Sequence, residues 1–213
     1  MKMQSALACS LAALALVGCQ KAADHIADEL GKDKAAAETV GQWTGPCDTT
    51  TFVVAAAGIK SSVAVYDFYN NVGRTTKLFA DEQCKNEVAE STYSGTAVIG
   101  TATSFDSNAH ILDLNYTNVS IKILDQSLLN FMNNPVTPGS GINDWKLNDA
   151  REVTSNVNSP TGTCPYVAKT GQVFDVLKVD GRSMHFGAKD LSHDKSTQDK
   201  RPIALDNSVT YTK

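Results

Sequence analysis

The feature that most limits what this chain can fold into is the alternation of apolar and polar residues in short runs separated by turn residues. Residues 62–69 and 74–80 alternate on either side of an Asn-Asn-Val-Gly turn, which predicts a β-hairpin. In the first run two valines lie on one face, and Tyr66 and Phe68 lie on the other. Because a period of two places successive side chains on opposite faces of a sheet, the pattern favours an all-β fold.

The same pattern recurs along the rest of the chain. A change of phase near Thr117 predicts a β-bulge within one of the later runs. Asp180-Gly181 is a strong signal for a hairpin turn. The further predicted strands are residues 92–103, 111–124, 173–179, 183–187 and 201–211.

Helical sequence is scarce by comparison. Residues 125–132 predict one short helix with Asp125 as its N-cap and Met132 on its packed face. Residues 133–143 and 188–200 predict polar loops. About eight to ten strands with a single short helix predict an antiparallel barrel or a sandwich. The hydrophobic content of 42% is sufficient for its core.

The chain before Gly41 differs in composition from the rest. It is rich in alanine, and Ile26 and Leu30 are four residues apart with charges between them, which predicts a short helix or a flexible tether. At Gly41 the aromatic and turn residues of the β-rich part begin. We therefore expect a single domain at residues 41–213, preceded by a tether at residues 19–40.

The first residues of the chain are typical of an export signal. Lys2 is the only charge before position 21, and residues 6–17 are almost entirely alanine and leucine. Such a run has the length of the apolar part of a secretory signal and is too short to cross a bilayer as a helix. We therefore expect residues 1–18 to be a cleavable signal peptide.

The motif Leu16-Val17-Gly18-Cys19 resembles the lipobox of bacterial lipoproteins, in which aliphatic and small residues precede a cysteine. The resemblance implies cleavage before Cys19 and acylation of that cysteine on sulfur and nitrogen. Several acyl chains give stable anchoring, so the expected partner is a membrane. Gln20 follows the cysteine where a signal for inner-membrane retention often has Asp, so the resemblance implies the bacterial outer membrane.

The chain has five cysteines. Cys9 leaves with the signal and Cys19 is the predicted lipidation site, so Cys47, Cys84 and Cys164 remain. In an oxidising envelope two of these three are expected to pair. We expect the pair to be Cys47–Cys84, because each lies beside strand-like sequence and they close the shorter loop. Cys164 is then a free thiol, either buried or reactive, and the other two pairings stay open.

Two further features resemble the lipocalins and their calycin relatives: Gly41-Gln42-Trp43 near the start of the β-rich part, and Arg201 late in the chain. In that family such a Trp lies at the floor of the barrel and a late Arg packs across it. The resemblance implies that Trp43 and Arg201 form a barrel floor and that the barrel binds a small apolar ligand. The central Thr-Asp-Tyr motif of the family is absent here. The alternative is a core Trp and a surface Arg in ordinary packing roles.

No catalytic, metal-binding or cofactor-binding motif is present in the sequence. A nucleophile elbow, a phosphate-binding loop and a His-Glu-x-x-His motif are all missing. No histidine is spaced for zinc with a cysteine or another histidine. A net charge of −4 with scattered basic residues argues against nucleic acid as a partner. We therefore expect no metal, no cofactor and no enzymatic activity.

These observations predict a non-enzymatic, membrane-anchored lipoprotein of the cell envelope whose β-barrel binds a small apolar ligand or a protein partner. The alternative is a surface interaction protein, such as an adhesin, an assembly factor or an inhibitor of a host enzyme like lysozyme. In that case the loops at residues 133–143 and 188–200 would be exposed on the cell. A hydrolase with a site built from scattered residues is a third hypothesis, since spacing does not reveal such a site.

Overall fold

The computed structural model describes residues 31–50, 57–69, 71–134, 144–153 and 170–213. Most of these residues are in β-strands, and the helices among them are short. The strands are β1 (Gln42–Thr44), β2 (Ser61–Asp67), β3 (Val72–Phe79), β4 (Glu87–Ala102), β5 (Ala109–Ile123), β6 (Ala150–Glu152), β7 (Gly171–Asp180), β8 (Ser183–Phe186) and β9 (Tyr211–Thr212).

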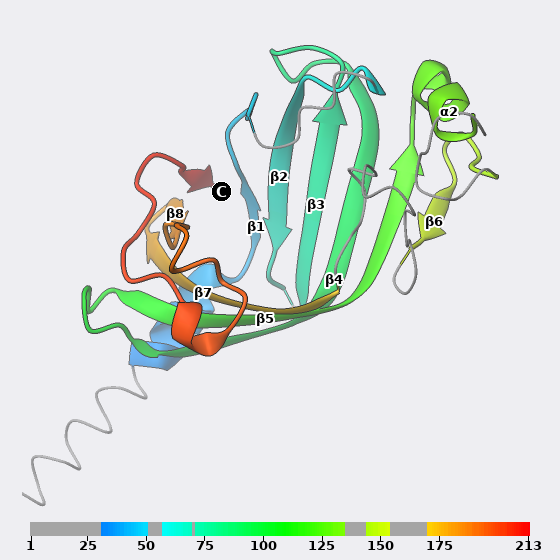
Figure 1. Ribbon diagram of the computed structural model, residues 1–213. Coiled ribbons are helices and arrows are strands. Elements are labelled where there is room, and N and C mark those ends of the chain that lie inside the picture. The colour runs from blue at the N-terminus through cyan, green and yellow to red at the C-terminus, as the bar shows by residue number, and fades with distance from the viewer. Residues whose placement is uncertain (1–30, 51–56, 70, 135–143, 154–169) are drawn as a thin grey trace, which may run out of the picture.

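The strands form one antiparallel sheet that closes on itself (Figure 1). Their order is β4-β3-β2-β1-β9-β8-β7-β5-β6, and a further pairing of β4 with β5 closes eight of them into a barrel, with β6 added to the edge of β5. The all-β prediction is confirmed. Of the two predicted architectures the protein adopts the barrel.

The two longest strands, β4 and β5, carry the predicted bulge. Ser94 pairs with Asn118 and the next residue, Gly95, pairs with Tyr116, so Thr117 has no partner in the register. A Cβ atom at Gly95 would overlap the carbonyl oxygen of Asn115, so only glycine allows the strands to approach this closely. The bulge at Thr117 is therefore confirmed, and it shifts the inward-facing positions of β5 by one residue.

Buried apolar side chains form two clusters. We call the first the inner cluster, because its members come from strands all around the barrel and fill its interior. Its members are Trp43, Tyr66, Phe68, Val72, Leu112, Leu114, Tyr116, Leu177, Met184 and Phe186. We call the second the flank cluster, which lies between the sheet and the short helix that follows it. Its members are Ile59, Leu78, Val88, Ala89, Val119, Ile121, Ile123, Leu128, Met132, Trp145 and Val153.

The helix α2 (Gln126–Met132) covers the flank cluster as the sequence predicts. The carboxylate of Asp125 accepts a hydrogen bond of 2.8 Å from the backbone N–H of Leu128, so Asp125 is the N-cap. Leu128 and Met132 are the buried residues of the helix. At its other end the Asn133 side chain accepts from the N–H of Trp145 at 2.8 Å and donates to its carbonyl oxygen at 3.0 Å. These bonds tie the helix to the segment that leads into β6.

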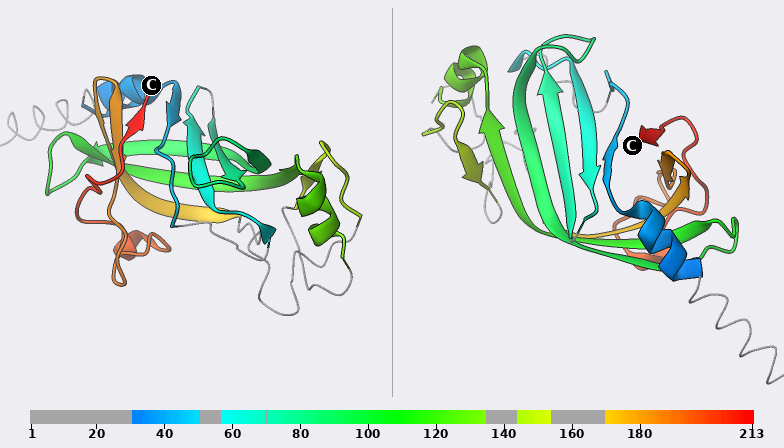
Figure 2. Two further views of the ribbon diagram at one scale, coloured as in Figure 1. Left: turned by 90° about the horizontal axis from the view of Figure 1, so that it is seen from above. Right: turned by 180° about the vertical axis from the view of Figure 1, so that it is seen from behind.

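Residues 31–39 are helical and lie at one end of the barrel, and α2 lies at the opposite side of the molecule (Figure 2). We call these residues the N-terminal helix. Ala35 and Thr39 are buried in it, and the indole N–H of Trp43 donates to the carbonyl oxygen of Thr39 at 2.7 Å. The expected tether at residues 19–40 therefore needs a correction, because its last part packs on the barrel. The part before residue 31 lies outside the described residues.

The last predicted strand is wrong over most of its length. Of residues 201–211, only Tyr211 lies in a strand, β9. Pro202 has no backbone N–H to donate to a ladder, and the Asp206 carboxylate accepts from the N–H of Ser208 at 3.0 Å, which makes a turn. The predicted loop at residues 188–200 is present and contains a short 3₁₀ helix, Gln198–Lys200.

The predicted disulfide is confirmed. Cys47 and Cys84 are bonded, with Cα atoms 5.9 Å apart and a sequence separation of 37 residues. The bond joins the segment after β1 to the connection between β3 and β4. Cys19 and Cys164, which are the other cysteines of interest, lie outside the described residues. No helix among the described residues is long and apolar enough to cross a membrane.

Candidate functional site

A row of aromatic and basic residues crosses the inside of the barrel. In the strand register Trp43 pairs with Tyr66, Tyr66 pairs with Arg74, and Arg74 pairs with Tyr93. Directly paired residues point to the same face of a sheet. Since Trp43 and Tyr66 belong to the inner cluster, Arg74 also points into the barrel.

The guanidinium of Arg74 lies between two tyrosine rings. Its central carbon is 5.7 Å from the ring centre of Tyr66 and 5.7 Å from that of Tyr93. Both distances are within the range of a cation–π interaction. Tyr116 and Tyr211 belong to the same layer, because Tyr116 contacts Tyr93 with ring centres 5.5 Å apart and Tyr211 contacts Tyr66 at 5.4 Å. We call these five residues the tyrosine layer.

Three hydrogen-bonding atoms in and beside the tyrosine layer have no partner among the described residues. They are Nε of Arg74, Oγ1 of Thr76 and Oη of Tyr116. Thr76 is two residues after Arg74 on β3 and therefore shares its inward face. Burying such groups without a partner destabilises a fold by about 1–3 kcal/mol for each group, so their presence here indicates a partner outside the described residues.

The hydroxyls of Tyr66, Tyr116 and Tyr211 in this layer remain protonated at neutral pH. Burial raises the pKa of Tyr66, Tyr116 and Tyr211 above the ordinary value, and the nearby Arg74 lowers it by less. Each of these groups therefore carries an O–H that can donate a hydrogen bond.

The acid nearest to the tyrosine layer, Asp175, is already bound. Its carboxylate lies 2.8 Å from Nζ of Lys195 and accepts backbone N–H bonds from Val176 at 2.8 Å and Gly187 at 3.1 Å. Burial raises the pKa of Asp175, although Lys195 and the two N–H groups lower it. These bonds occupy the carboxylate oxygens and leave Arg74 without an acid among the described residues.

The tyrosine layer is not sealed from solvent. Tyr66 and Tyr116 keep only 9% and 5% of their surface exposed. Arg74 and Tyr93, which also point inward, are only partly buried. These two side chains of the layer therefore keep some contact with solvent.

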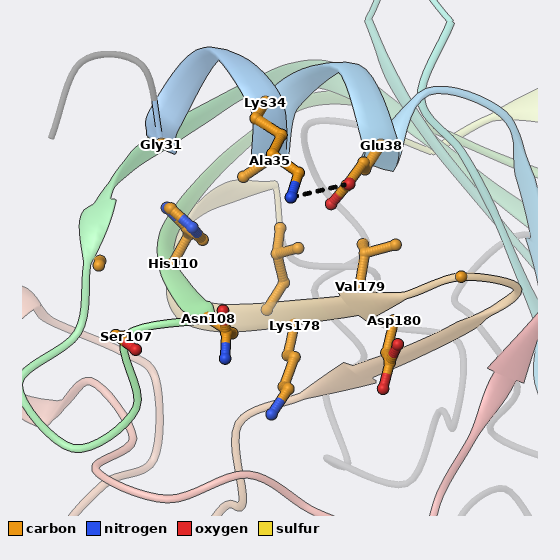
Figure 3. A pocket seen from close by; sticks show the side chains of 13 residues that line it. Gly31, Lys34, Ala35, Glu38, Ser107, Asn108, His110, Lys178, Val179 and Asp180 are labelled. Atoms are coloured by element: carbon orange, nitrogen blue, oxygen red, sulfur yellow. Dashed lines mark ion pairs between the residues drawn. The ribbon is translucent and has the colours of Figure 1, made fainter. Parts of the chain in front are cut away.

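A second space lies under the N-terminal helix (Figure 3). This cleft has a volume of about 580 Å³ and lies between the helix, β7 and the turn between β4 and β5. Figure 3 shows Val179 pointing towards the helix, and Lys178 and Asp180 pointing to the other side of the strand.

Three of the four charged side chains that line this end cleft have partners within the chain. Lys34 lies 3.7 Å from Glu38, and Lys178 lies 2.8 Å from Asp106. The ring of His110 is hydrogen-bonded to the carbonyl oxygen of a neighbouring strand residue at 3.2 Å. The end cleft therefore offers fewer unsatisfied groups to a ligand than the tyrosine layer does.

The structure separates the two residues predicted to form a barrel floor. Trp43 has no exposed surface, and the cation over its ring is Lys213, whose Nζ is 4.5 Å from the ring centre. Lys213 also donates to the carbonyl oxygen of Glu38 at 3.1 Å, so it ties Trp43 to the N-terminal helix. Trp43 thus lies at the helix-covered end of the barrel, with a lysine in the place expected for Arg201.

Arg201 lies instead on the outer face of β5 and β7. Its guanidinium is 5.5 Å from the ring centre of Phe174 and donates to the carboxylate of Asp113 at 2.6 Å. It also donates to the carbonyl oxygens of Leu112 at 3.1 Å and Asp175 at 2.6 Å. These bonds fasten the long loop after β8 to the barrel wall and have no part in the interior.

The sequence analysis missed Arg74 as a site residue. It was identified only as the first residue of the returning strand of a hairpin. The alternation in this strand could have identified Arg74, because Val72, Arg74, Thr76 and Leu78 share one face of the strand. An arginine is unusual on a face whose other residues are buried.

No group of three metal-binding side chains occurs among the described residues. In comparisons with known proteins, no family model matches this chain and no curated protein matches its sequence. The function is therefore inferred from the chemistry of the tyrosine layer.

Proposed function

We propose that this protein is a lipid-anchored, non-enzymatic lipoprotein of the outer membrane whose barrel binds a small ligand. The observation that carries the proposal is the group of three unpartnered polar atoms on Arg74, Thr76 and Tyr116 inside the closed barrel. Buried polar groups in native proteins nearly always have partners, and a set of such groups without partners on the inside of one barrel is typical of a binding site. A barrel of eight strands is wide enough either for a packed interior or for one small ligand, and the unpartnered atoms favour the ligand.

The proposed anchor rests on the lipobox. The N-terminal helix agrees with it, because it is the described segment nearest in sequence to Cys19 and it packs on one end of the barrel. In this arrangement the helix-covered end of the barrel faces the membrane. Arg74 and Tyr93, which keep some exposed surface, stay accessible to a ligand.

Native mass spectrometry of the full chain, extracted from membranes in a mild detergent, tests the proposal. We expect the acylated protein to carry a further small molecule that is released on denaturation. The variant Cys19→Ser should leave the membrane and lose the acyl mass while it keeps a folded β-sheet spectrum. A protein that takes up no small molecule from membrane extracts would contradict ligand binding. A Cys19→Ser variant that is still acylated would contradict the anchor.

Exposed apolar side chains favour a second candidate function, the binding of a protein partner. Leu191 is fully exposed, and Ile203 and Phe105 are 64% and 40% exposed. Ile203 and Phe105 line the same surface depression between the β4–β5 turn and the loop before β9. Protease treatment of intact cells tests this function, because a surface interaction protein should be cut in residues 188–200. A loop that stays intact on the cells would argue against it.

A further inference from the structure

Arg74 differs from the other arginines of the chain in its partners. The chain has four arginines, and all lie in the described residues. The acceptors of the other three are Asp144 for Arg151, Asp113 for Arg201 and the carbonyl oxygen of Lys213 for Arg182. Arg74 has aromatic rings on two sides and no acceptor among the described residues. It is therefore the one arginine for which the described residues supply no hydrogen-bond acceptor.

A cation inside a barrel needs an anion. Removing a charge from water costs several kcal/mol unless a partner compensates for it, and cation–π contacts return about 0.5–2 kcal/mol. Asp175 is not the partner, because its charge is already paired with Lys195 and its other oxygen accepts two backbone N–H groups. A negatively charged group outside the described residues, such as that of a bound ligand, would supply this partner.

The other unpartnered atoms fit the same group. The Thr76 hydroxyl shares the inward face of β3 with Arg74, and the Tyr116 ring contacts Tyr93, which lies against Arg74. Both hydroxyls can donate, as can Nε of Arg74. A carboxylate has two oxygens with about four acceptor positions, enough for these three donors.

The charge balance selects the class of anion. One guanidinium and two neutral hydroxyls carry a single positive charge, so a monoanion leaves the interior neutral. A phosphate monoester carries about −1.5 to −2 at neutral pH and would leave a buried negative charge. The surrounding rings of Tyr66, Tyr93, Phe186 and Tyr211 offer apolar faces to the rest of the ligand.

Given the proposed ligand-binding function, on which this step rests, we infer that the ligand is an amphipathic monocarboxylate. Its carboxylate binds Arg74, Thr76 and Tyr116, and its apolar body lies against the tyrosine layer. The sequence predicts a small apolar ligand, and Arg74 adds the requirement that this ligand carry a negative charge.

Binding of matched probes to the purified, delipidated chain tests this inference. The probes are dodecanoate, its neutral methyl ester and dodecyl phosphate, each measured by competition with a fluorescent fatty-acid analogue. We expect dodecanoate to bind about tenfold or more tightly than the ester, since a hydrogen bond to a charged group contributes this much. Arg74→Met should remove that difference, whereas Arg74→Lys should keep part of it.

Two further variants distinguish an effect on the site from a loss of folding. Tyr116→Phe removes one hydroxyl and keeps the ring, and it should weaken dodecanoate binding severalfold without changing ester binding. Arg151→Met removes an arginine that lies over Trp145 and binds Asp144, and it should leave the binding of all three probes unchanged.

The outcomes distinguish the two levels of the proposal. If the ester binds as tightly as dodecanoate and Arg74→Met binds both as the native chain does, the barrel binds apolar ligands and the carboxylate inference is wrong. If dodecyl phosphate binds most tightly and depends on Arg74, the anion site stands and the choice of a monocarboxylate is wrong. If the folded native chain binds none of the probes and native mass spectrometry finds no ligand, the proposed function itself fails.

Discussion

Three arginines of this molecule lie over aromatic rings. Two of them, Arg74 and Arg151, lie beside the two buried clusters, and their surroundings differ. In the flank cluster, Arg151 lies 5.5 Å from the ring centre of Trp145 and binds the carboxylate of Asp144. In the inner cluster, Arg74 lies between two tyrosines and has no acid partner among the described residues. The same side chain is thus neutralised where it supports packing and left without a counter-charge inside the barrel.

The flank cluster and the inner cluster also differ in whether their polar groups have partners. The flank cluster consists almost entirely of aliphatic residues under α2, and its neighbouring polar groups, such as Asp125 and Asn133, have partners. The inner cluster is rich in aromatic rings and contains unpartnered polar atoms. With the proposed function, the flank cluster stabilises the fold, and we propose that part of the inner cluster is arranged for a ligand at some expense in stability.

The largest expected effect is on stability, in the flank cluster. Ile121→Ala should lower the free energy of unfolding by about 3 kcal/mol, because Ile121 is 2% exposed and its loss leaves a cavity. Chemical denaturation of the purified domain measures this change. The dodecanoate affinity of the folded variant should be unchanged. An affinity that falls together with the stability would show that the two clusters do not have separate roles.

A smaller effect is expected at the cap of α2. Asp125→Ala should lower the free energy of unfolding by about 1 kcal/mol, since it removes the acceptor for the N–H of Leu128. Thermal unfolding with and without dodecanoate measures both stability and binding. Asp125→Asn keeps a capping oxygen and is the matched control, which should stay within a few tenths of a kcal/mol of the native chain.

The smallest effect concerns the ion pair of Lys178 with Asp106 beside the end cleft. The hydrogen bond from Lys178, together with one from the N–H of Asn108, lowers the pKa of Asp106. A lowered pKa contributes stability above the ordinary pKa of the acid, and this contribution is lost as the pH falls through the lowered value.

Lys178→Met should therefore reduce stability by about 0.5 kcal/mol at neutral pH, as is usual for a partly exposed pair. The difference from the native chain should vanish in acid, below the lowered pKa of Asp106. Denaturation across a pH series measures it. Equal differences at neutral and acid pH would show that Lys178 acts through packing and not through its charge.

Much of the barrel could be predicted because its strands alternate clearly. The bulge at Thr117, the cap at Asp125 and the disulfide of Cys47 with Cys84 follow from local patterns, and the structure contains all three. The choice of a barrel over a sandwich could not be made from these patterns. It depends on the pairings of β4 with β5 and of β1 with β9. The alternation of apolar and polar residues does not show which strands pair.

The parts that were missed depend on contacts distant in sequence. The N-terminal helix is weakly amphipathic, and its attachment to the barrel depends on Trp43 and Lys213. Trp43 follows the helix by a few residues, whereas Lys213 follows it by the whole length of the domain. The expected floor of Trp43 and Arg201 relied on a resemblance in residue type, whereas Asp113 and Phe174 hold Arg201 on the outer face. The role of Arg74 as a site residue cannot be recognised until the residues that lie beside it on the two neighbouring strands are known.

The central claim is that Arg74 is retained for a ligand and not for the fold. The most direct test measures the unfolding free energy and the dodecanoate affinity of Arg74→Met together, with Arg151→Met as the control. The account predicts that Arg74→Met without ligand is more stable than the native chain by about 1 kcal/mol and binds dodecanoate about tenfold more weakly or worse. An Arg74→Met variant that is less stable than the native chain and binds dodecanoate equally well would contradict the account.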